Sequence, residues 1–235
     1  MINNKILDNQ ILASISQDEY KVLFLNLEYV SLVSGQLIYK KDQKIDYVYF
    51  PLHSMISLVS VLSNKATIEI GLIGNEGLVG LPVFLGGNYA TNETIVQIPN
   101  SAMRLDAKIF LAESRRSGEL QRILLLYTQA RLTQISQNAV CKCHHSINQQ
   151  LATWLLFAHD SVDQDELPLT QKFISQMLGV RRASVTEVAQ KFQKAGIIQY
   201  TRGSITILNR DLLESVSCDC YDLVKMEFKR LLDFT

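Results

Sequence analysis

The spacing of hydrophobic residues changes along the chain and predicts an α+β fold. Apolar residues recur at three- and four-residue intervals over residues 5–28, which predicts an N-terminal helix. From Val30 to Ala107, short β-rich runs alternate with glycine and proline, which is typical of a compact β-roll. The expected strands are residues 47–50, 56–62, 67–73 and 94–98.

Residues 106–140 return to the helical period, and the segment 119–140 contains neither glycine nor proline. This segment carries two apolar stripes, and a helix that is apolar on two sides must be covered on two sides. The roll can cover one stripe. The other is covered either by the same helix of a second copy, which predicts a homodimer, or by another domain of the same chain. The stripes are Leu120, Ile123, Leu124, Tyr127 and Ala130, and then Leu125, Leu132, Ile135 and Ala139.

Another amphipathic helix is expected over residues 146–160, and the segment 169–188 that follows has the spacing of a helix-turn-helix. Thr170 can cap a first helix, and Gly179 supplies the left-handed turn after it. A second helix is expected from Arg181 to Lys194. The runs 197–200 and 204–208, joined by Thr201-Arg202-Gly203, then predict a β-hairpin wing.

The outward face of the second helix is basic, with four basic residues and one acidic residue between Gly179 and Ala195. This local charge suits phosphate contacts, and the first turn of a recognition helix reaches base edges in the major groove. Arg182 is the expected base reader, because an arginine can donate two hydrogen bonds to guanine. Glu187 could accept from cytosine. The full set of expected DNA contacts is Thr170, Gln171, Arg181, Arg182, Ser184, Thr186, Glu187, Gln190, Lys191 and Arg202.

These patterns divide the chain into three parts. Residues 1–117 form a roll with a sensor role, residues 118–145 a dimerisation helix and hinge, and residues 146–235 a winged helix-turn-helix domain. The 23 basic and 23 acidic residues give no net charge, so the argument for DNA rests on the local face alone. No apolar run reaches the roughly 18 residues of a membrane span, and the first residues do not resemble a signal peptide. We therefore expect a cytoplasmic protein.

With these residues in place, the chain resembles the cyclic-AMP receptor protein/Fnr family of bacterial transcription regulators over nearly its whole length. The resemblance implies a homodimer that binds a pseudo-palindromic site on double-stranded DNA, with RNA polymerase as a further candidate partner. The family's base-reading arginine falls on Arg182. Ala183 stands where the best-known pattern has glutamate, and Glu187 where it has arginine, so a different DNA site is expected.

The nucleotide-binding members of this family carry a Gly-x-x-Gly-Glu run followed by an Arg-Ser/Thr-Ala run. Here Gly77 and Gly80 are present, but Leu81 replaces the glutamate. The second run falls at Asn92-Glu93-Thr94, where an acidic residue would repel a phosphate. We therefore expect no cofactor and predict that neither cyclic AMP nor cyclic GMP binds. Residues 74–87 are either a structural turn or part of a pocket for a different small molecule.

Two cysteine pairs, Cys141 with Cys143 and Cys218 with Cys220, carry the remaining candidate chemistry. Thiolates favour zinc and iron–sulfur clusters, so the pairs could serve a metal- or redox-responsive regulator if they meet in space. The spacing is not Cys-x-x-Cys, and the Fnr-type N-terminal cysteines are absent, so incidental thiols are the alternative.

Two other classes of function are weighed against DNA binding. An enzyme built on the roll would need several histidine or carboxylate ligands, and the roll holds one histidine, His53, with no nucleophile–base pair. The chain is therefore not expected to be an enzyme. A protein-interaction module that binds no DNA would not need the basic helix face.

Overall fold

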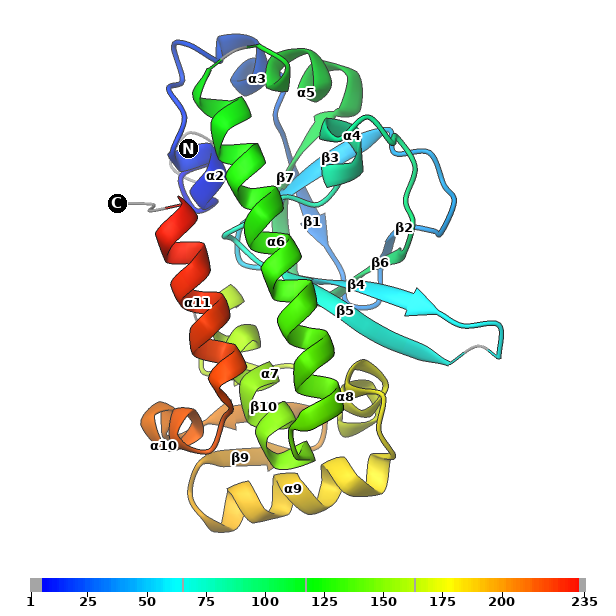
Figure 1. Ribbon diagram of the computed structural model, residues 1–235, viewed down its shortest axis with the longest axis vertical. Helices are drawn as coiled ribbons and strands as arrows, with labels where there is room; N and C mark the ends of the chain where they lie inside the picture. The colour runs from blue at the N-terminus through cyan, green and yellow to red at the C-terminus, as the bar shows by residue number, and fades with distance from the viewer. Residues whose placement is uncertain (1–5, 65, 117, 163, 233–235) are drawn as a thin grey trace.

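A long helix, α6 (Glu119–His144), joins the two halves of the molecule, as Figure 1 shows. The computed structural model describes residues 6–64, 66–116, 118–162 and 164–232. Lys5, the first residue of the expected N-terminal helix, lies outside the described residues. The N-terminal half is a β-roll, and the C-terminal half is mostly helical. None of the described helices is long and apolar enough to cross a membrane.

The roll consists of two antiparallel sheets with strand orders β1-β7-β3 and β2-β6-β4-β5. Its core includes Phe50, Val96 and Leu105, all fully buried. The strands are β1 (Glu28–Leu32), β2 (Leu37–Tyr39), β3 (Tyr47–Pro51), β4 (Met55–Val61), β5 (Thr67–Ile73), β6 (Glu93–Ile98) and β7 (Asn100–Asp106). Short helices flank them: α2 (Gln10–Ala13), α3 (Lys21–Leu25), α4 (Leu81–Phe84) and α5 (Ala107–Ser114). The α+β prediction is confirmed, and each of the four expected strands is present within one residue of its expected bounds.

The expected single helix over residues 5–28 is wrong. Over its described residues 10–28 the segment forms two short helices, α2 and α3, and β1 begins at Glu28. Asn9 caps α2, and its side-chain amide donates to the carbonyl oxygens of Pro51 and Gly77 at 3.0 and 2.9 Å. These long-range bonds fix the chain against the roll, so tertiary contacts override the helical period.

The expected continuous helix over residues 106–140 is also wrong, because it divides into α5 and α6 at Gly118. The Tyr20 hydroxyl accepts from the backbone N–H of Leu120 at 3.0 Å and lies where a side chain on residue 118 would be. The break therefore places Tyr20 against the first turn of α6.

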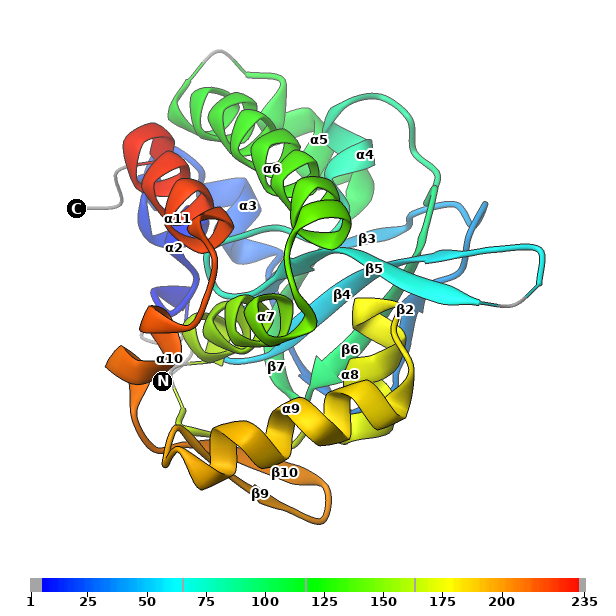
Figure 2. The same cartoon turned by 60° about the horizontal axis from the view of Figure 1, so that its bottom comes forward.

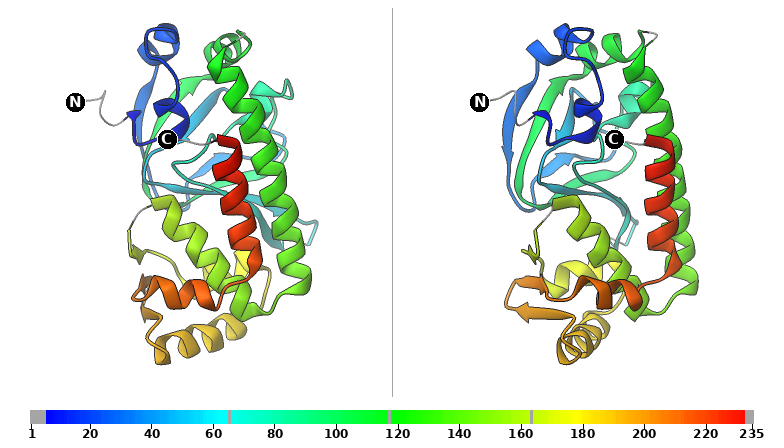
Figure 3. Two further views of the ribbon diagram at one scale, coloured as in Figure 1. Left: turned by 60° about the vertical axis from the view of Figure 1, so that its left-hand side comes forward. Right: turned by 90° about the vertical axis from the view of Figure 1, so that its left-hand side faces the viewer.

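The two stripes of α6 have different surroundings. The stripe that begins at Leu120 is buried against the roll, with all five members at most 2% exposed. In the second stripe, Leu125 is 57% and Leu132 is 63% exposed. The alternative that another domain of the same chain covers this stripe therefore does not hold in the described residues. The last helix, α11 (Asp219–Leu232), runs beside α6 in every view, and Phe228 meets Tyr127 edge to face at 6.4 Å (Figures 1 and 3).

The C-terminal half contains α7 (Ile147–Val162), α8 (Gln171–Leu178), α9 (Arg182–Lys194) and α10 (Arg210–Ser215), together with a sheet of order β8-β10-β9. Its strands are β8 (Glu166–Leu167), β9 (Ile198–Thr201) and β10 (Ser204–Ile207). Helix α7 packs against β4 and β5, so the two halves share an interface as well as α6.

A buried carboxylate holds this interface together. Glu69 on β5 is 3% exposed and accepts from the Trp154 indole N–H of α7 at 2.8 Å and from the Ser57 hydroxyl. The Lys142 ammonium on α6 donates to the backbone oxygens of Glu69 and, at 3.2 Å, of Met177 on α8. Burial raises the pKa of Glu69, because its hydrogen bonds and the nearby cations only partly offset desolvation. Five elements, β4, β5, α6, α7 and α8, therefore meet at one polar cluster.

We predict that Glu69→Ala lowers the free energy of unfolding by about 2 kcal/mol or more, because two buried donors lose their acceptor. Glu69→Gln keeps an acceptor for Trp154 and removes the buried charge, so it should cost less. Urea denaturation followed by tryptophan fluorescence measures both. Equal losses for the two variants would contradict this account of the cluster.

The same variants also test the sign of the pH dependence. Because the pKa of Glu69 is raised in the folded state, the folded protein binds this proton more tightly than the unfolded chain does. The contribution of Glu69 to stability should therefore increase as the pH falls from the folded pKa toward the ordinary carboxyl range. Glu69→Gln should lack this increase in denaturation experiments repeated across that range.

Candidate DNA interface and ligand cavity

Helices α8 and α9 form the expected helix-turn-helix. The Thr170 hydroxyl accepts from the backbone N–H of Phe173 at 3.1 Å and caps α8, and Gly179 ends α8 with a left-handed φ of 70°. Ser175 is buried at the contact between the helices. The apolar face of α9 is buried, and it consists of Val185, Val188, Ala189 and Phe192.

The opposite face of α9 lies on the outer surface, at the end of the molecule farthest from the roll (Figures 1 and 2). Arg181 takes the position just before the helix, and Arg182 begins it. Both side chains are exposed, as are Gln190 and Lys191. The two arginines are therefore accessible at the end of the helix from which base edges are read.

Some of the expected contact residues already have partners within the protein. Gln171 is 7% exposed and accepts from the Thr186 hydroxyl at 2.7 Å, which links α8 to α9. Glu187 forms an ion pair with Lys191 at 2.8 Å, and the hydrogen bond from Lys191 lowers the pKa of Glu187. Ser184 is half-buried. Thr170, which caps α8, is exposed.

The wing is a hairpin of β9 and β10, and β8 pairs with the far edge of β10. Ser204 pairs with Thr201, so the turn is Arg202-Gly203, one residue shorter than expected. Gly203 has a φ of 93°, which favours glycine. Arg202 is exposed at the tip.

A cavity of about 190 Å³ lies between the roll and α6. Four of the expected pocket residues line it: Gly80, Leu81, Asn92 and Thr94. Gly77 and Glu93 do not line it. Gly77 instead packs against Tyr127, whose hydroxyl accepts from the backbone N–H of Leu78 at 3.1 Å. Gly77 therefore belongs to a structural turn that packs against α6, whereas Gly80 borders the cavity.

Arg131 on α6 lines the same cavity and was missed by sequence reasoning. Its side chain is 4% exposed, and one guanidinium nitrogen, Nη1, donates to the backbone oxygen of Leu72 and to Gln134. The other, Nη2, is buried without a hydrogen-bond partner among the described residues. The sequence signal that could have identified Arg131 is its position four residues after Tyr127, which places it on the buried side of α6.

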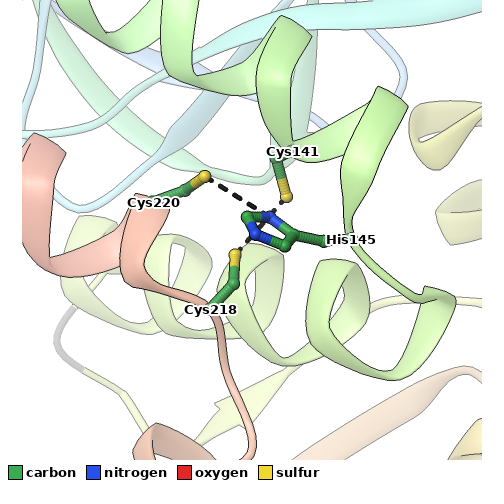
Figure 4. A group of neighbouring side chains, drawn as sticks. All are labelled: Cys141, His145, Cys218 and Cys220. Atoms are coloured by element: carbon green, nitrogen blue, oxygen red, sulfur yellow. Dashed lines mark hydrogen bonds between the residues drawn. The ribbon is translucent and has the colours of Figure 1, made fainter.

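The four cysteines do not group as the sequence pairs suggested. Cys141, Cys218 and Cys220 are buried beside the half-buried His145 (Figure 4). Cys143 is exposed and lies outside this group. Burial and the neighbouring sulfur atoms raise the pKa of Cys141 and Cys220. Sequence reasoning missed His145 as a ligand, although it lies four residues after Cys141, directly past the end of α6.

Comparison with known proteins places the C-terminal half in a described family and the whole chain among known folds. Residues 149–216 match the Crp-like helix-turn-helix domain. No curated protein sequence is significantly similar to the chain. FixK2 from Bradyrhizobium japonicum is 17% identical, over 82% of this chain and 98% of FixK2, with a TM-score of 0.69. A putative Crp/Fnr-family transcriptional regulator from Eubacterium rectale is 16% identical, over 88% and 96% of the two chains, with a TM-score of 0.67.

A third structure extends the comparison. The c-di-GMP-responsive global regulator CLP of Xanthomonas campestris is 11% identical, over 83% of this chain and all 100% of CLP, with a TM-score of 0.64. The matched domain contains α8, α9 and the wing, and the remainder of the chain adopts the roll and long helix of these regulators. Residues 149–216 are therefore a Crp-like helix-turn-helix domain, and the chain as a whole shares the fold of these regulators.

Proposed function

We propose that the chain is a cytoplasmic, homodimeric and sequence-specific regulator, in which α9 enters the major groove and the roll responds to a ligand other than cyclic AMP. The observation that carries this proposal is the exposed basic start of α9. Arg181 and Arg182 stand free of the protein core at the outer end of the molecule, and the winged hairpin adds Arg202. We propose three units: residues 1–117, 118–145 and 146–235.

The side chains on this face support a division of roles. Arg182 has the reach and the exposure to donate to guanine O6 and N7. Lys191 and Arg202 suit phosphates, whose contacts fix orientation without reading sequence. Glu187 must leave its ion pair with Lys191 before it can accept from cytosine, so its reading role competes with a contact inside the protein. Gln171 and Thr186 hold α8 against α9, which places them as positioning residues.

The exposed stripe on α6 supports a symmetric dimer. Leu125 and Leu132 are large apolar side chains on one accessible helix face, and a second copy of α6 would bury both sets. A twofold axis along α6 would present two copies of α9, which suits a pseudo-palindromic site. RNA polymerase remains a proposed further partner.

The cavity supports a small ligand. Its volume of about 190 Å³ is below the roughly 300–1,000 Å³ of typical ligand pockets, so a nucleotide would have to enlarge it. The buried Nη2 of Arg131 offers a hydrogen bond to an acceptor group in such a ligand. Ile135 borders the cavity and also belongs to the exposed stripe of α6, so a ligand would touch the helix that we propose forms the dimer.

We predict that Arg182→Ala weakens binding to a site selected from random DNA by about 1–3 kcal/mol and relaxes its sequence preference. Arg202→Ala should lower the affinity for all DNA sequences by a similar factor, since it removes a phosphate contact. It should also reduce the dependence of affinity on salt concentration. Fluorescence anisotropy at several salt concentrations measures both. Arg115→Ala is the matched control, because Arg115 is exposed at the end of α5, in the opposite half of the molecule. An unchanged preference in Arg182→Ala would rule out Arg182 as the base reader.

We predict that Leu132→Glu converts a dimer into a monomer, because each copy would place a charge in the apolar α6 interface. Light scattering at micromolar concentration reports the mass. Leu62→Glu is the control, since Leu62 is 54% exposed, directly follows β4 and does not belong to the α6 stripe. A monomeric unmodified protein, or a dimer that survives Leu132→Glu, would contradict the proposed interface.

We predict that calorimetry detects no micromolar binding of cyclic AMP or cyclic GMP. Leu81 offers no carboxylate to a ribose, and the cavity is small. Micromolar binding of either nucleotide would refute the prediction.

A further inference from the structure

Four potential metal ligands from distant parts of the chain converge beneath the junction of α6 and α7. Cys141 lies in the last turn of α6 and His145 directly follows that helix. Cys218 directly precedes α11, and Cys220 lies in its first turn (Figure 4). Their sulfur and nitrogen atoms all lie within 4.8 Å of one another. Each of the three cysteines is at most 6% exposed.

Two of the spacings between these atoms match a tetrahedral shell around one ion, and the others are at most 4.8 Å. Zinc–sulfur bonds of about 2.3 Å and zinc–nitrogen bonds of about 2.05 Å imply sulfur–sulfur edges of about 3.8 Å and sulfur–nitrogen edges of about 3.6 Å. The Sγ atoms of Cys141 and Cys218 are 3.6 Å apart, and Cys220 Sγ lies 3.5 Å from His145 Nδ1. The side chains therefore need little movement to bind an ion.

The residues around the cluster also suit a metal centre. His145 directs Nδ1 toward the cysteines, and its Nε2 lies 3.4 Å from a carboxylate oxygen of Asp219. A carboxylate on the far ring nitrogen is the arrangement that orients histidine ligands at zinc sites. The Thr153 hydroxyl lies 3.1 Å from Cys218 Sγ and accepts from the backbone N–H of Cys218 at 3.2 Å, so its proton can point to the sulfur.

The geometry favours a single ion over the other uses of clustered cysteines. The Cys141–Cys218 sulfur distance of 3.6 Å is far longer than the roughly 2.05 Å of a disulfide, and a third cysteine and a histidine share the site. An iron–sulfur cluster places several atoms inside its ligand shell, which this compact set cannot enclose. Three cysteines and one histidine are a common ligand set for structural zinc.

We propose that Cys141, His145, Cys218 and Cys220 bind one zinc ion, which fastens the start of α11 to the end of α6. All four ligand positions are supplied by the protein, so the site is structural and leaves no position for a substrate. The ion would attach the segment after α10, which leads into α11, to the junction between α6 and α7. It would thereby limit how the DNA-binding half moves relative to α6. The site does not depend on DNA binding.

Metal analysis of the full chain tests this directly. Protein purified anaerobically from cells supplied with zinc should contain about one zinc ion per chain, as measured by inductively coupled plasma mass spectrometry. Reduced metal-free protein titrated with Co²⁺ should develop the visible bands of tetrahedral cobalt and an ultraviolet thiolate charge-transfer band. Removing the metal with a chelator should lower the Tm by about 5 °C or more, and zinc should restore it.

Neighbouring residues provide matched variants. Cys141→Ser and His145→Ala should lose most of the zinc, whereas Cys143→Ser and His144→Ala should keep it, because Cys143 and His144 are exposed. The cobalt charge-transfer band should lose about a third of its intensity in any single cysteine variant that still binds. Thiol labelling of the unmodified protein serves where a variant fails to fold: only Cys143 should react before chelation, and all four cysteines after it.

Other results would overturn the proposal. Zinc well below one per chain together with no cobalt spectrum would do so. So would equal zinc loss in the Cys143→Ser and Cys141→Ser variants, or a Cys141–Cys218 disulfide in anaerobically purified protein.

Discussion

The buried carboxylate of Glu69 is the constraint on which the arrangement of the two halves depends. A carboxylate that is 3% exposed is unfavourable unless donors surround it, and here the donors come from Trp154 on α7 and Ser57 on β4. Because Trp154 belongs to the C-terminal half and Glu69 to the roll, neither half can satisfy these groups alone. The requirement for hydrogen bonds therefore sets where α7 sits on the roll, and α8 and α9 follow from α7.

Helix α6 connects the features on which the proposed regulation depends. Its buried stripe packs on the roll, Arg131 and Ile135 border the cavity, and Leu132 faces outward. Its last turn carries Cys141, and His145 directly follows it. A rigid helix transmits a displacement along its length, because its backbone hydrogen bonds and packing resist bending. A change at the cavity would therefore reach both the exposed stripe and the junction with α7.

Sequence reasoning succeeded where the signal was local and failed where a distant partner decided the structure. The helix-turn-helix was predictable because the cap at Thr170 and the turn at Gly179 lie within a few residues of the helices they define. Strands β1 and β7 were not predicted, since Glu28 pairs with Arg104 across most of the roll. His145 was missed because its partner Cys220 lies 75 residues away in the chain.

Strand β5 links the cavity to the interface between the halves. Two neighbouring residues of β5 contact these two regions, because Ile70 lines the cavity while Glu69 contacts Trp154. Gly71 lies against the guanidinium of Arg131, and a side chain there would collide with Nη2. The Leu72 carbonyl accepts from the same arginine. A ligand that draws Arg131 into the cavity would therefore pull on β5 within three residues of Glu69, and the carboxylate cluster would carry that displacement to α7 and the DNA-binding helices.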